Sequence, residues 1–193
     1  MNIIELLTEK EKRHIKYINL KKTQTLFFEN DLCSDIGIMI SGEVTIKSYL
    51  NDGKEIIYNI LKKGDIFGNN LIFSSNPYYK GNIIASTDCE IGLISKEDLL
   101  YIFNKNETFL KEYLKIQSNF SKSLNNRIKL LSIDSAKERL LFYLHENKNE
   151  IHFDSITSLA AELYLSRESL SRTISKLKKD RYIIKDKKII RLI

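Results

Sequence analysis

Two residue types that build cofactor and disulfide sites are scarce in this sequence of 193 residues. It has two cysteines, Cys33 and Cys89, too few for a disulfide framework or for an iron–sulfur cluster, which needs about four. The three histidines all lie outside residues 20–95, which excludes a histidine metal site on the strands expected there. We therefore predict no metal and no cofactor, and we interpret both cysteines as small core residues, with a thiol switch as the alternative.

Long hydrophobic runs and catalytic motifs are also missing. No apolar run approaches the roughly 20 residues of a membrane span, and the acidic residues near the start do not fit a secretory signal. The "HENKN" stretch at His145 lacks the second histidine of a zinc protease helix, and no Ser/His/Asp or Cys/His arrangement has local support. We expect a cytoplasmic protein that is not an enzyme and that makes no membrane contact.

Glycine is confined to one region: all seven glycines lie between Gly37 and Gly92. Residues 20–95 are also rich in Ile, Val, Tyr and Phe, and Asp52-Gly53 separates two strand-like runs, which favours a hairpin. Many short strands with regular turns predict a small antiparallel barrel or sandwich. The first 19 residues are interpreted as helical and packed on the outside of it.

A long helix is predicted over residues 107–131, after a shorter helix that starts at Ser95. The long helix carries two apolar stripes at 3–4 spacing, so it must be covered on two sides. One side can face the barrel, and the other favours the same helix of a second subunit. The alternative is a buried central helix of a monomer. The residues expected at the dimer interface are Phe109, Tyr113, Ile116, Phe120, Leu124 and Arg127.

Positive charge is concentrated near the end of the chain. Residues 155–193 hold ten Lys/Arg and four Asp/Glu, a net charge of +6, whereas residues 1–154 hold 21 of each sign. A hinge at 132–134 and a further helix precede this region, which reads as two short helices followed by a two-strand hairpin with its tip near Asp186-Lys187. A local basic field of this kind attracts polyanions.

The second short helix, residues 166–179, has two distinct faces at about 100° per residue. Leu170, Ile174 and Leu177 share one face, and a short break with Ser166 as N-cap precedes the helix, as in a helix-turn-helix unit. The opposite face is polar. One interpretation is that this face has no binding function and is a solvated surface with a Glu168–Arg172 ion pair.

The other interpretation is that the polar face contacts DNA bases. Arginine donates two hydrogen bonds to guanine, and a carboxylate accepts one from cytosine. The residues expected to contact bases are Arg167, Glu168, Ser171 and Arg172. Contacts to phosphate, which position without specifying, are expected from Ser155, Thr157, Ser166, Ser169, Lys176, Lys185, Lys187 and Lys188.

The stretch "LAAELYLSRESLSRTISKLKKDRYI" resembles the winged helix-turn-helix of the Crp/Fnr family of bacterial transcription regulators. The resemblance implies that Arg167, Glu168 and Arg172 read the half-site, with Ser171 replacing Arg167 in the oxygen-sensing branch. It also implies double-stranded DNA and RNA polymerase as partners of a homodimer. Tyr164 stands where the family usually has a turn glycine, and a tyrosine tolerates a positive φ poorly, so a slightly different turn is expected.

The stretch "KKGDIFGNNLIFSSNPYYKGNIIAS" resembles the phosphate-binding cassette of cyclic-nucleotide-binding domains. The ribose-binding Gly-Glu pair reads Gly68-Asn69, and the phosphate-binding arginine falls near Tyr79-Lys80. The Thr-Ser pair that caps adenine in cyclic-AMP binders matches Ser123-Leu124. We therefore expect a degenerate effector pocket and an effector other than cyclic AMP, because a lysine is only a point charge where a buried phosphate needs fixed donors.

The predicted fold class is α+β: an N-terminal antiparallel β-roll of the jelly-roll type, a long dimerisation helix and a C-terminal winged helix-turn-helix. The corresponding segments are residues 1–104, 105–132 and 133–193. The alternative function is a ligand-binding or dimerisation module whose basic C-terminal part contacts protein or membrane rather than DNA.

Overall fold

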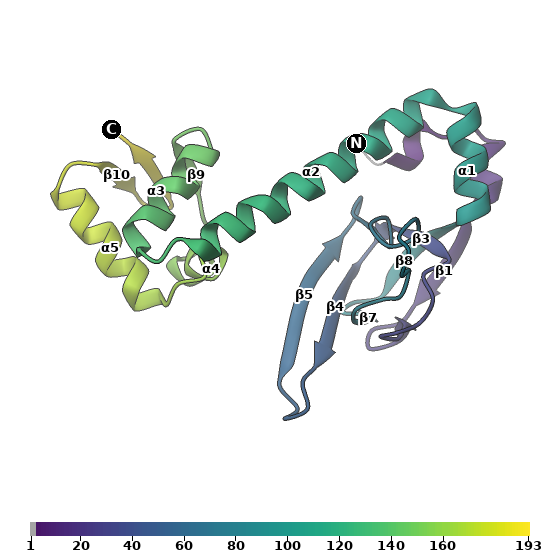
Figure 1. The fold of residues 1–193 in the computed structure, drawn as a ribbon, viewed down its shortest axis with the longest axis horizontal. Coiled ribbons are helices and arrows are strands. Elements are labelled where there is room, and N and C mark those ends of the chain that lie inside the picture. The colour runs from purple at the N-terminus through teal and green to yellow at the C-terminus, as the bar shows by residue number, and fades with distance from the viewer. Residues whose placement is uncertain (1–2) are drawn as a thin grey trace. The chain divides into compact units, whose positions relative to one another are not determined.

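The computed structural model describes residues 3–193, which divide into two compact units at residues 118 and 119. Each unit has its own hydrophobic core. Helix α2 (Glu107–Ser132) begins in the first unit and ends in the second (Figure 1). The division therefore runs through the helix that the sequence treats as one dimerisation segment.

The first unit is built on two four-stranded antiparallel sheets, in the orders β1-β8-β3-β6 and β2-β7-β4-β5. Buried residues from both sheets, including Ile38 and Ile91 of one and Val44 and Ile83 of the other, form one core. The strands of the first sheet are β1 (Lys16–Leu20), β3 (Asp35–Ser41), β6 (Ile66–Phe67) and β8 (Cys89–Ser95). Those of the second are β2 (Thr25–Phe27), β4 (Glu43–Tyr49), β5 (Glu55–Lys62) and β7 (Asn82–Ala85).

One glycine is required by this packing. Gly37 pairs with Phe67 in the β3–β6 ladder, and a Cβ at Gly37 would lie 1.9 Å from the ring of Phe67. The Asp52-Gly53 hairpin is confirmed as well: β4 and β5 pair antiparallel up to Tyr49 and Glu55, and Gly53 has φ +81°. A left-handed conformation of this kind costs glycine little.

The expectation for the first 19 residues is wrong in part. Only two short 3₁₀ helices, Ile3–Leu6 and Glu11–His14, precede β1, which occupies Lys16–Leu20. Strand β1 pairs along its whole length with β8, so hydrogen bonding to a distant strand determines its conformation. Residues 1–2, part of the expected helix, lie outside the described residues.

Helix α1 (Lys96–Lys105) starts where the sequence predicts. Ser95 is its N-cap, with the hydroxyl accepting a hydrogen bond from the Asp98 N–H at 3.1 Å. Leu99 and Ile102 of α1 are fully buried in the core of the first unit.

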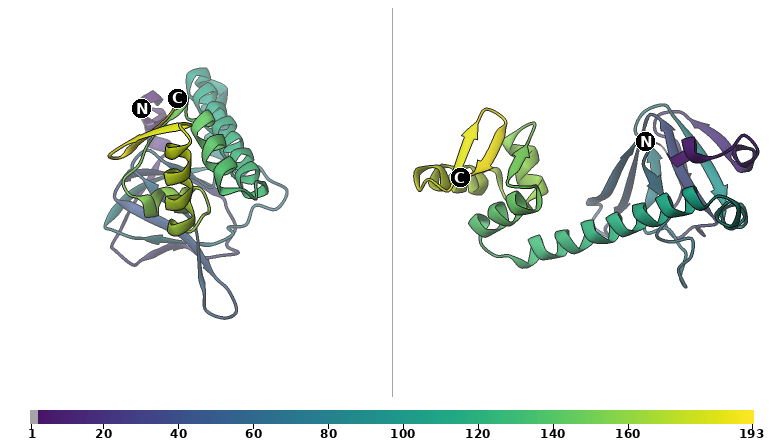
Figure 2. Two further views of the ribbon diagram at one scale, coloured as in Figure 1. Left: turned by 90° about the vertical axis from the view of Figure 1, so that its left-hand side faces the viewer. Right: turned by 90° about the horizontal axis from the view of Figure 1, so that it is seen from above.

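The second unit contains three further helices and a small sheet (Figure 2). The helices are α3 (Ala136–Glu146), α4 (Ile156–Glu162) and α5 (Arg167–Lys179), and the strands are β9 (Glu150–His152), β10 (Ile183–Asp186) and β11 (Ile189–Leu192). The predicted two-strand hairpin is β10–β11, to which the unpredicted strand β9 adds in the order β10-β11-β9. The fold class is therefore confirmed as α+β, with an antiparallel β-roll, a long helix and a winged helix-turn-helix.

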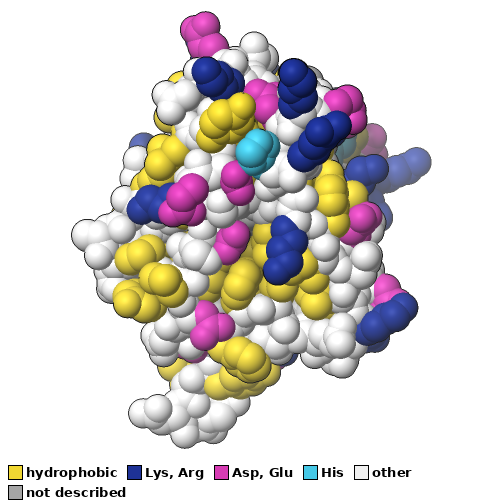
Figure 3. Space-filling model, turned by 90° about the vertical axis from the view of Figure 1, so that its right-hand side faces the viewer, with side chains coloured by type: hydrophobic (Ala, Val, Ile, Leu, Met, Phe, Trp, Pro, Cys, Tyr) yellow, Lys and Arg dark blue, Asp and Glu magenta, His cyan; other side chains and the backbone are white. Residues whose placement is uncertain are grey.

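The surface of the first unit mixes charges of both signs. Figure 3 shows Lys and Arg side chains interspersed with Asp and Glu on the face turned to the viewer, with apolar groups between them. This agrees with the charge count of residues 1–118, which hold 15 Lys/Arg and 16 Asp/Glu. Within residues 3–193, no helix is long and apolar enough to span a membrane.

Candidate nucleic-acid interface

Helix α5 is fixed in the second unit by one face only. Leu170, Ile174 and Leu177 are at most 5% exposed and belong to the core, whereas the opposite side chains are exposed. The exposed set on the first turns contains all four residues expected to contact bases, namely Arg167, Glu168, Ser171 and Arg172. The sequence therefore identified a contiguous polar surface correctly, and whether this surface binds DNA is taken up below as a proposal.

The two charged groups at the centre of this surface do not pair with each other. Among the ion pairs of residues 3–193, none joins the Glu168 carboxylate to the Arg172 guanidinium. Arg172 instead donates from Nε to the backbone carbonyl of Glu168 over a long 3.4 Å. Both charged groups are thus turned to solvent, where a ligand can engage them.

Serine residues cap the N-termini of α4 and α5. The Ser155 hydroxyl accepts from the Ser158 N–H at 3.0 Å, and the Ser166 hydroxyl accepts from the Ser169 N–H at 3.1 Å. The Ser155 hydroxyl also donates to the Ser158 hydroxyl at 3.1 Å, whereas the Ser166 hydroxyl, which accepts its cap bond, keeps a proton that it can donate. The expected phosphate contacts Thr157 and Lys176 are exposed, and Ser169 is half-buried.

The turn between α4 and α5 keeps a left-handed residue although that residue is a tyrosine. Tyr164 has φ +53°, and its carbonyl accepts a hydrogen bond from Arg139 at 2.9 Å. The Leu165 N–H bonds back to the Ala160 carbonyl at 2.9 Å, which closes the turn. The tyrosine therefore adopts the left-handed conformation of the turn itself, and the different turn expected from the sequence is not formed.

The wing holds lysines at its tip and a neutralised arginine at its base. Lys187 and Lys188 are exposed at the turn between β10 and β11, while half-buried Lys185 donates to the Lys187 carbonyl at 2.9 Å. Arg191 is paired with Glu150, and this guanidinium lowers the pKa of the Glu150 carboxyl. Within the wing, the lysines that are free to contact a polyanion therefore lie at its tip.

The polar groups of Asn69, in the cassette of the first unit, form hydrogen bonds within the protein. Asn69 is 8% exposed, and its side-chain amide donates to Oε1 of Gln117 at 3.0 Å. The Asn69 carbonyl accepts from the amide of Gln117 and from the Tyr113 hydroxyl, the latter at 3.1 Å. The position where the sequence expects a ribose contact is therefore occupied by hydrogen bonds to helix α2.

Comparisons with known proteins agree with this architecture. Residues 17–106 match the family model of the cyclic nucleotide-binding domain. The anaerobic regulatory protein of Bacillus subtilis is 23% identical over 79% of this chain and 64% of its own length, so the match spans under two thirds of that relative. The HTH-type transcriptional regulator ArcR of Staphylococcus epidermidis is 25% identical over 95% of this chain and 83% of its own. The chain is thus similar, over most of its length, to transcription regulators of the Crp/Fnr type.

A solved structure supports the fold over the whole chain. A CooA mutant from Carboxydothermus hydrogenoformans matches with a TM-score of 0.67 and 19% identity, covering 100% of this chain and 91% of its own. At this identity the likeness concerns the fold.

One cassette residue is not placed as the sequence suggests. Tyr79 was expected in a degenerate effector pocket, but it is 3% exposed within the core, and its ring stacks on Phe27 with centroids 4.8 Å apart. Its hydroxyl donates to the Asp35 carbonyl at 3.4 Å, and burial raises its pKa well above the usual range. Lys80 is exposed, whereas Gly68 and Asn69 are buried.

Two residues expected at a dimer interface are buried in their own chain. Phe109 and Tyr113 are 0% and 3% exposed in the core of the first unit, because this end of α2 packs on the β-roll. Ile116 is half-buried against the same core, whereas Phe120, Leu124 and Arg127 are exposed. Three other apolar residues of α2 are exposed but are not among the residues predicted for the dimer interface: Leu114, Ile128 and Leu131.

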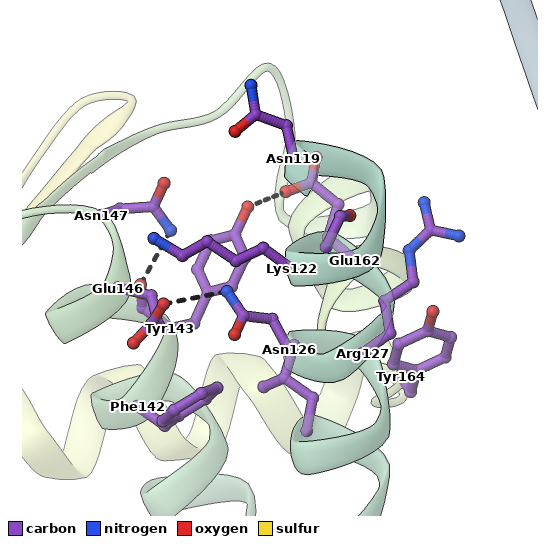
Figure 4. Close-up of a pocket in the computed structure, with 12 residues that line it drawn as sticks. Asn119, Lys122, Asn126, Arg127, Phe142, Tyr143, Glu146, Asn147, Glu162 and Tyr164 are labelled. Carbon is purple, nitrogen blue, oxygen red and sulfur yellow. Dashed lines mark hydrogen bonds between the residues drawn. The ribbon is translucent and has the colours of Figure 1, made fainter. Parts of the chain in front are cut away.

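The second unit contains a pocket that the sequence did not predict. It measures about 430 Å³ and lies between α2, the end of α3 and the α4–α5 turn (Figure 4). Ser123, expected at the effector pocket, lines it together with Lys122, Asn126 and Tyr164. A hydrogen bond of 2.6 Å from Tyr143 to Glu162 spans part of its wall. The lining residues come from separate helices without a shared motif, so no sequence signal marked them.

The two cysteines are core residues, as the sequence predicts. Cys33 and Cys89 are free and 2% and 5% exposed. Burial raises the pKa of both thiols, which keeps them protonated and lowers their reactivity.

Proposed function

We propose that the protein is a DNA-binding transcription regulator that binds an inverted-repeat operator as a homodimer. The observation that carries the proposal is the exposed face of α5, where Arg167, Glu168, Ser171 and Arg172 stand opposite three buried leucine and isoleucine side chains. The first turns of the second helix of a helix-turn-helix are those that reach base edges. The relatives named as regulators support the same role.

The face has the chemistry for base recognition. Arg167 and Arg172 each suit a guanine, and Glu168 suits a cytosine on the opposite strand. Neither Glu168 nor Arg172 is consumed by an ion pair with the other, so each retains its hydrogen-bonding capacity. By resemblance to the family we propose a half-site with a TGA core, and RNA polymerase as a further partner.

The exposed apolar part of α2 supports dimerisation. Leu124, Ile128 and Leu131 are 42%, 62% and 53% exposed and follow one another at helical spacing. The same helix of a second copy presents a matching stripe, so that a coiled-coil contact would remove both stripes from water. A two-fold dimer then offers two α5 helices to grooves about 34–36 Å apart.

The cassette supports an effector other than cyclic AMP. Asn69 has no carboxylate for a ribose, and its amide is engaged with Gln117. Tyr79 is buried in the core and Lys80 is exposed, so neither supplies the fixed fork that an arginine offers to a cyclic phosphate.

The alternative is a dimerisation module whose basic end contacts protein or membrane. A membrane-surface helix needs a free apolar face opposite its basic one. The apolar face of α5 is already buried in the core of the second unit, which favours DNA over a membrane.

Selection of binding sites from random DNA tests the proposal. The wild-type protein should select an inverted repeat, and Arg172→Ala should relax the preference at one position of each half-site. Failure to select an inverted repeat, or identical sites for both proteins, would show that this face does not read bases.

A further inference from the structure

Arg139 of α3 joins two separate segments of the second unit. The side chain is half-buried, and Nη1 donates to the carbonyls of Leu163 and Tyr164 at 3.3 and 2.9 Å. Its Nε donates to the carbonyl of Ile133, immediately after the end of α2. One guanidinium thus binds the segment between α2 and α3 and the turn before α5.

The carbonyls that Arg139 binds need such a donor. The last carbonyls of a helix have no partner within it, and Leu163 and Tyr164 follow the end of α4 directly. Tyr164 is also held at a positive φ, a conformation that persists only where surrounding structure enforces it. The guanidinium provides both the missing donor and the constraint.

The turn in question determines where α5 begins. Ser166 caps α5 two residues after Tyr164, and Arg167 and Glu168 form its first turn. A shift of the Tyr164 carbonyl would therefore move the base-facing side chains. A guanidinium has a rigid planar fork, whereas a lysine ammonium is a compact charge on a flexible stem and does not fix two segments.

We propose that Arg139 is a positioning residue that ties the end of α2 to the helix-turn-helix turn and so sets the orientation of α5 on DNA. This rests on the proposed DNA-binding function. Because Arg139 is bound to backbone carbonyls of its own chain, it acts through Arg167 and Glu168 rather than on bases.

The test compares full-length Arg139→Lys and Arg139→Met with wild type, and with Lys137→Met as a control. Lys137 is exposed on the same helix and places its Nζ over the ring of Tyr182, so its loss removes one charge without touching the turn. Affinities for a selected operator and for random duplex are measured at a temperature where circular dichroism shows every variant folded.

A positioning role predicts about a tenfold loss of operator affinity in both Arg139 variants, the cost of about one base contact. Affinity for random duplex should stay the same, because the phosphate-binding lysines remain. Lys137→Met should keep the operator-to-random ratio. An unchanged ratio in the Arg139 variants, even with reduced stability, would overturn the proposal.

Hydrogen exchange tests the role of Arg139 independently of DNA binding, so that failure of this role can be distinguished from failure of the proposed function. In Arg139→Met the Leu165 amide, bonded to the Ala160 carbonyl, should exchange at least tenfold faster than in wild type, relative to amides of α3. If wild type selects no operator, the DNA-binding proposal fails, and unchanged exchange at Leu165 would then also overturn the role of Arg139. Arg139→Lys provides the milder variant should Arg139→Met not fold.

Discussion

The cassette of the first unit and helix α5 of the second use their polar side chains in opposite ways. The buried Asn69 side chain donates to Gln117, whereas the Arg172 side chain is exposed and makes one long bond to its own helix. A buried polar group must find its partners within the protein. An exposed polar group outside any ion pair is free to bind a ligand, so the contrast supports a structural role for the cassette and the proposed recognition role for α5.

Helix α2 shows the same contrast along its length. Phe109 and Tyr113 are buried in the core of the first unit, while Leu124 and Ile128 are exposed. Apolar surface repeated at helical spacing and left in water indicates a missing partner. The comparison thus predicts which substitutions should affect binding and which should affect only stability.

The largest effect is expected from Ile128→Asp. A carboxylate in a coiled-coil seam would be buried without a partner, so the dimer should dissociate. Loss of the second half-site contact should reduce operator affinity by about 100-fold or more. Sedimentation at micromolar concentration and operator titration measure the two results.

Asn119→Asp is the matched control for this change. Asn119 is exposed on α2 at about 180° from Ile128 around the helix axis, so the new charge should stay in water and leave the dimer intact. A dimeric Ile128→Asp protein would show that the exposed stripe does not mediate assembly.

Much of this contrast could be predicted from the sequence where local chemistry determines the structure. Ser95 and Ser166 cap helices as their sequence positions indicate, and the Asp52-Gly53 hairpin forms. The polar face of α5 also follows from the sequence alone, because the spacing of apolar residues along a helix determines which face is buried and which is exposed.

The remainder depends on distant parts of the chain. Strand β1 exists because it pairs with β8, and three-residue β9 because it pairs with β11, and neither partner is visible in the local pattern. Tyr79 aligned with a ligand-binding position, but sequence spacing does not show that its ring packs on Phe27 in the core. The same limit applies to Phe109, because an apolar stripe does not say which of two surfaces covers it.

Arg172→Ala and Lys187→Ala should weaken DNA binding in different ways. Loss of Arg172 should cost about 1–3 kcal/mol on the operator and little on random duplex, since a base contact is lost. Loss of Lys187 should weaken both duplexes about equally and make the salt dependence shallower by about one unit of slope. Titrations of both DNAs at several salt concentrations measure these quantities. If both variants lose affinity for both duplexes equally, α5 contributes only charge.

Asn69→Ala should change stability rather than recognition. The substitution removes the hydrogen bond to Gln117 and leaves its Oε1 without that donor, which should lower the free energy of unfolding by about 1 kcal/mol. Urea unfolding measures this effect, and operator affinity should be unchanged. Millimolar cyclic AMP should not raise the melting temperature of wild type, whereas a clear rise would restore the cassette as a nucleotide site.

The smallest effect is expected at the turn, from Tyr164→Gly. A left-handed conformation costs an L-residue about 1–2 kcal/mol, and Tyr164 has φ +53°. Glycine relieves this cost but loses about 0.5–1 kcal/mol of chain entropy on folding. The free energy of unfolding should therefore rise by about 0.5 kcal/mol, which is small enough to need matched urea curves.

Tyr164→Ala separates the backbone from the ring. Tyr164 is 44% exposed, and its carbonyl accepts from Arg139 in either variant, so the alanine loses the ring and keeps the strained Cβ. The alanine variant should thus be no more stable than wild type, while the glycine variant is. Equal shifts in the two variants would assign the effect to the ring and would mean that the turn stores no backbone strain. A difference between them would show that Arg139 and the closing bonds hold a tyrosine in a conformation better suited to glycine, within a surface otherwise arranged for recognition.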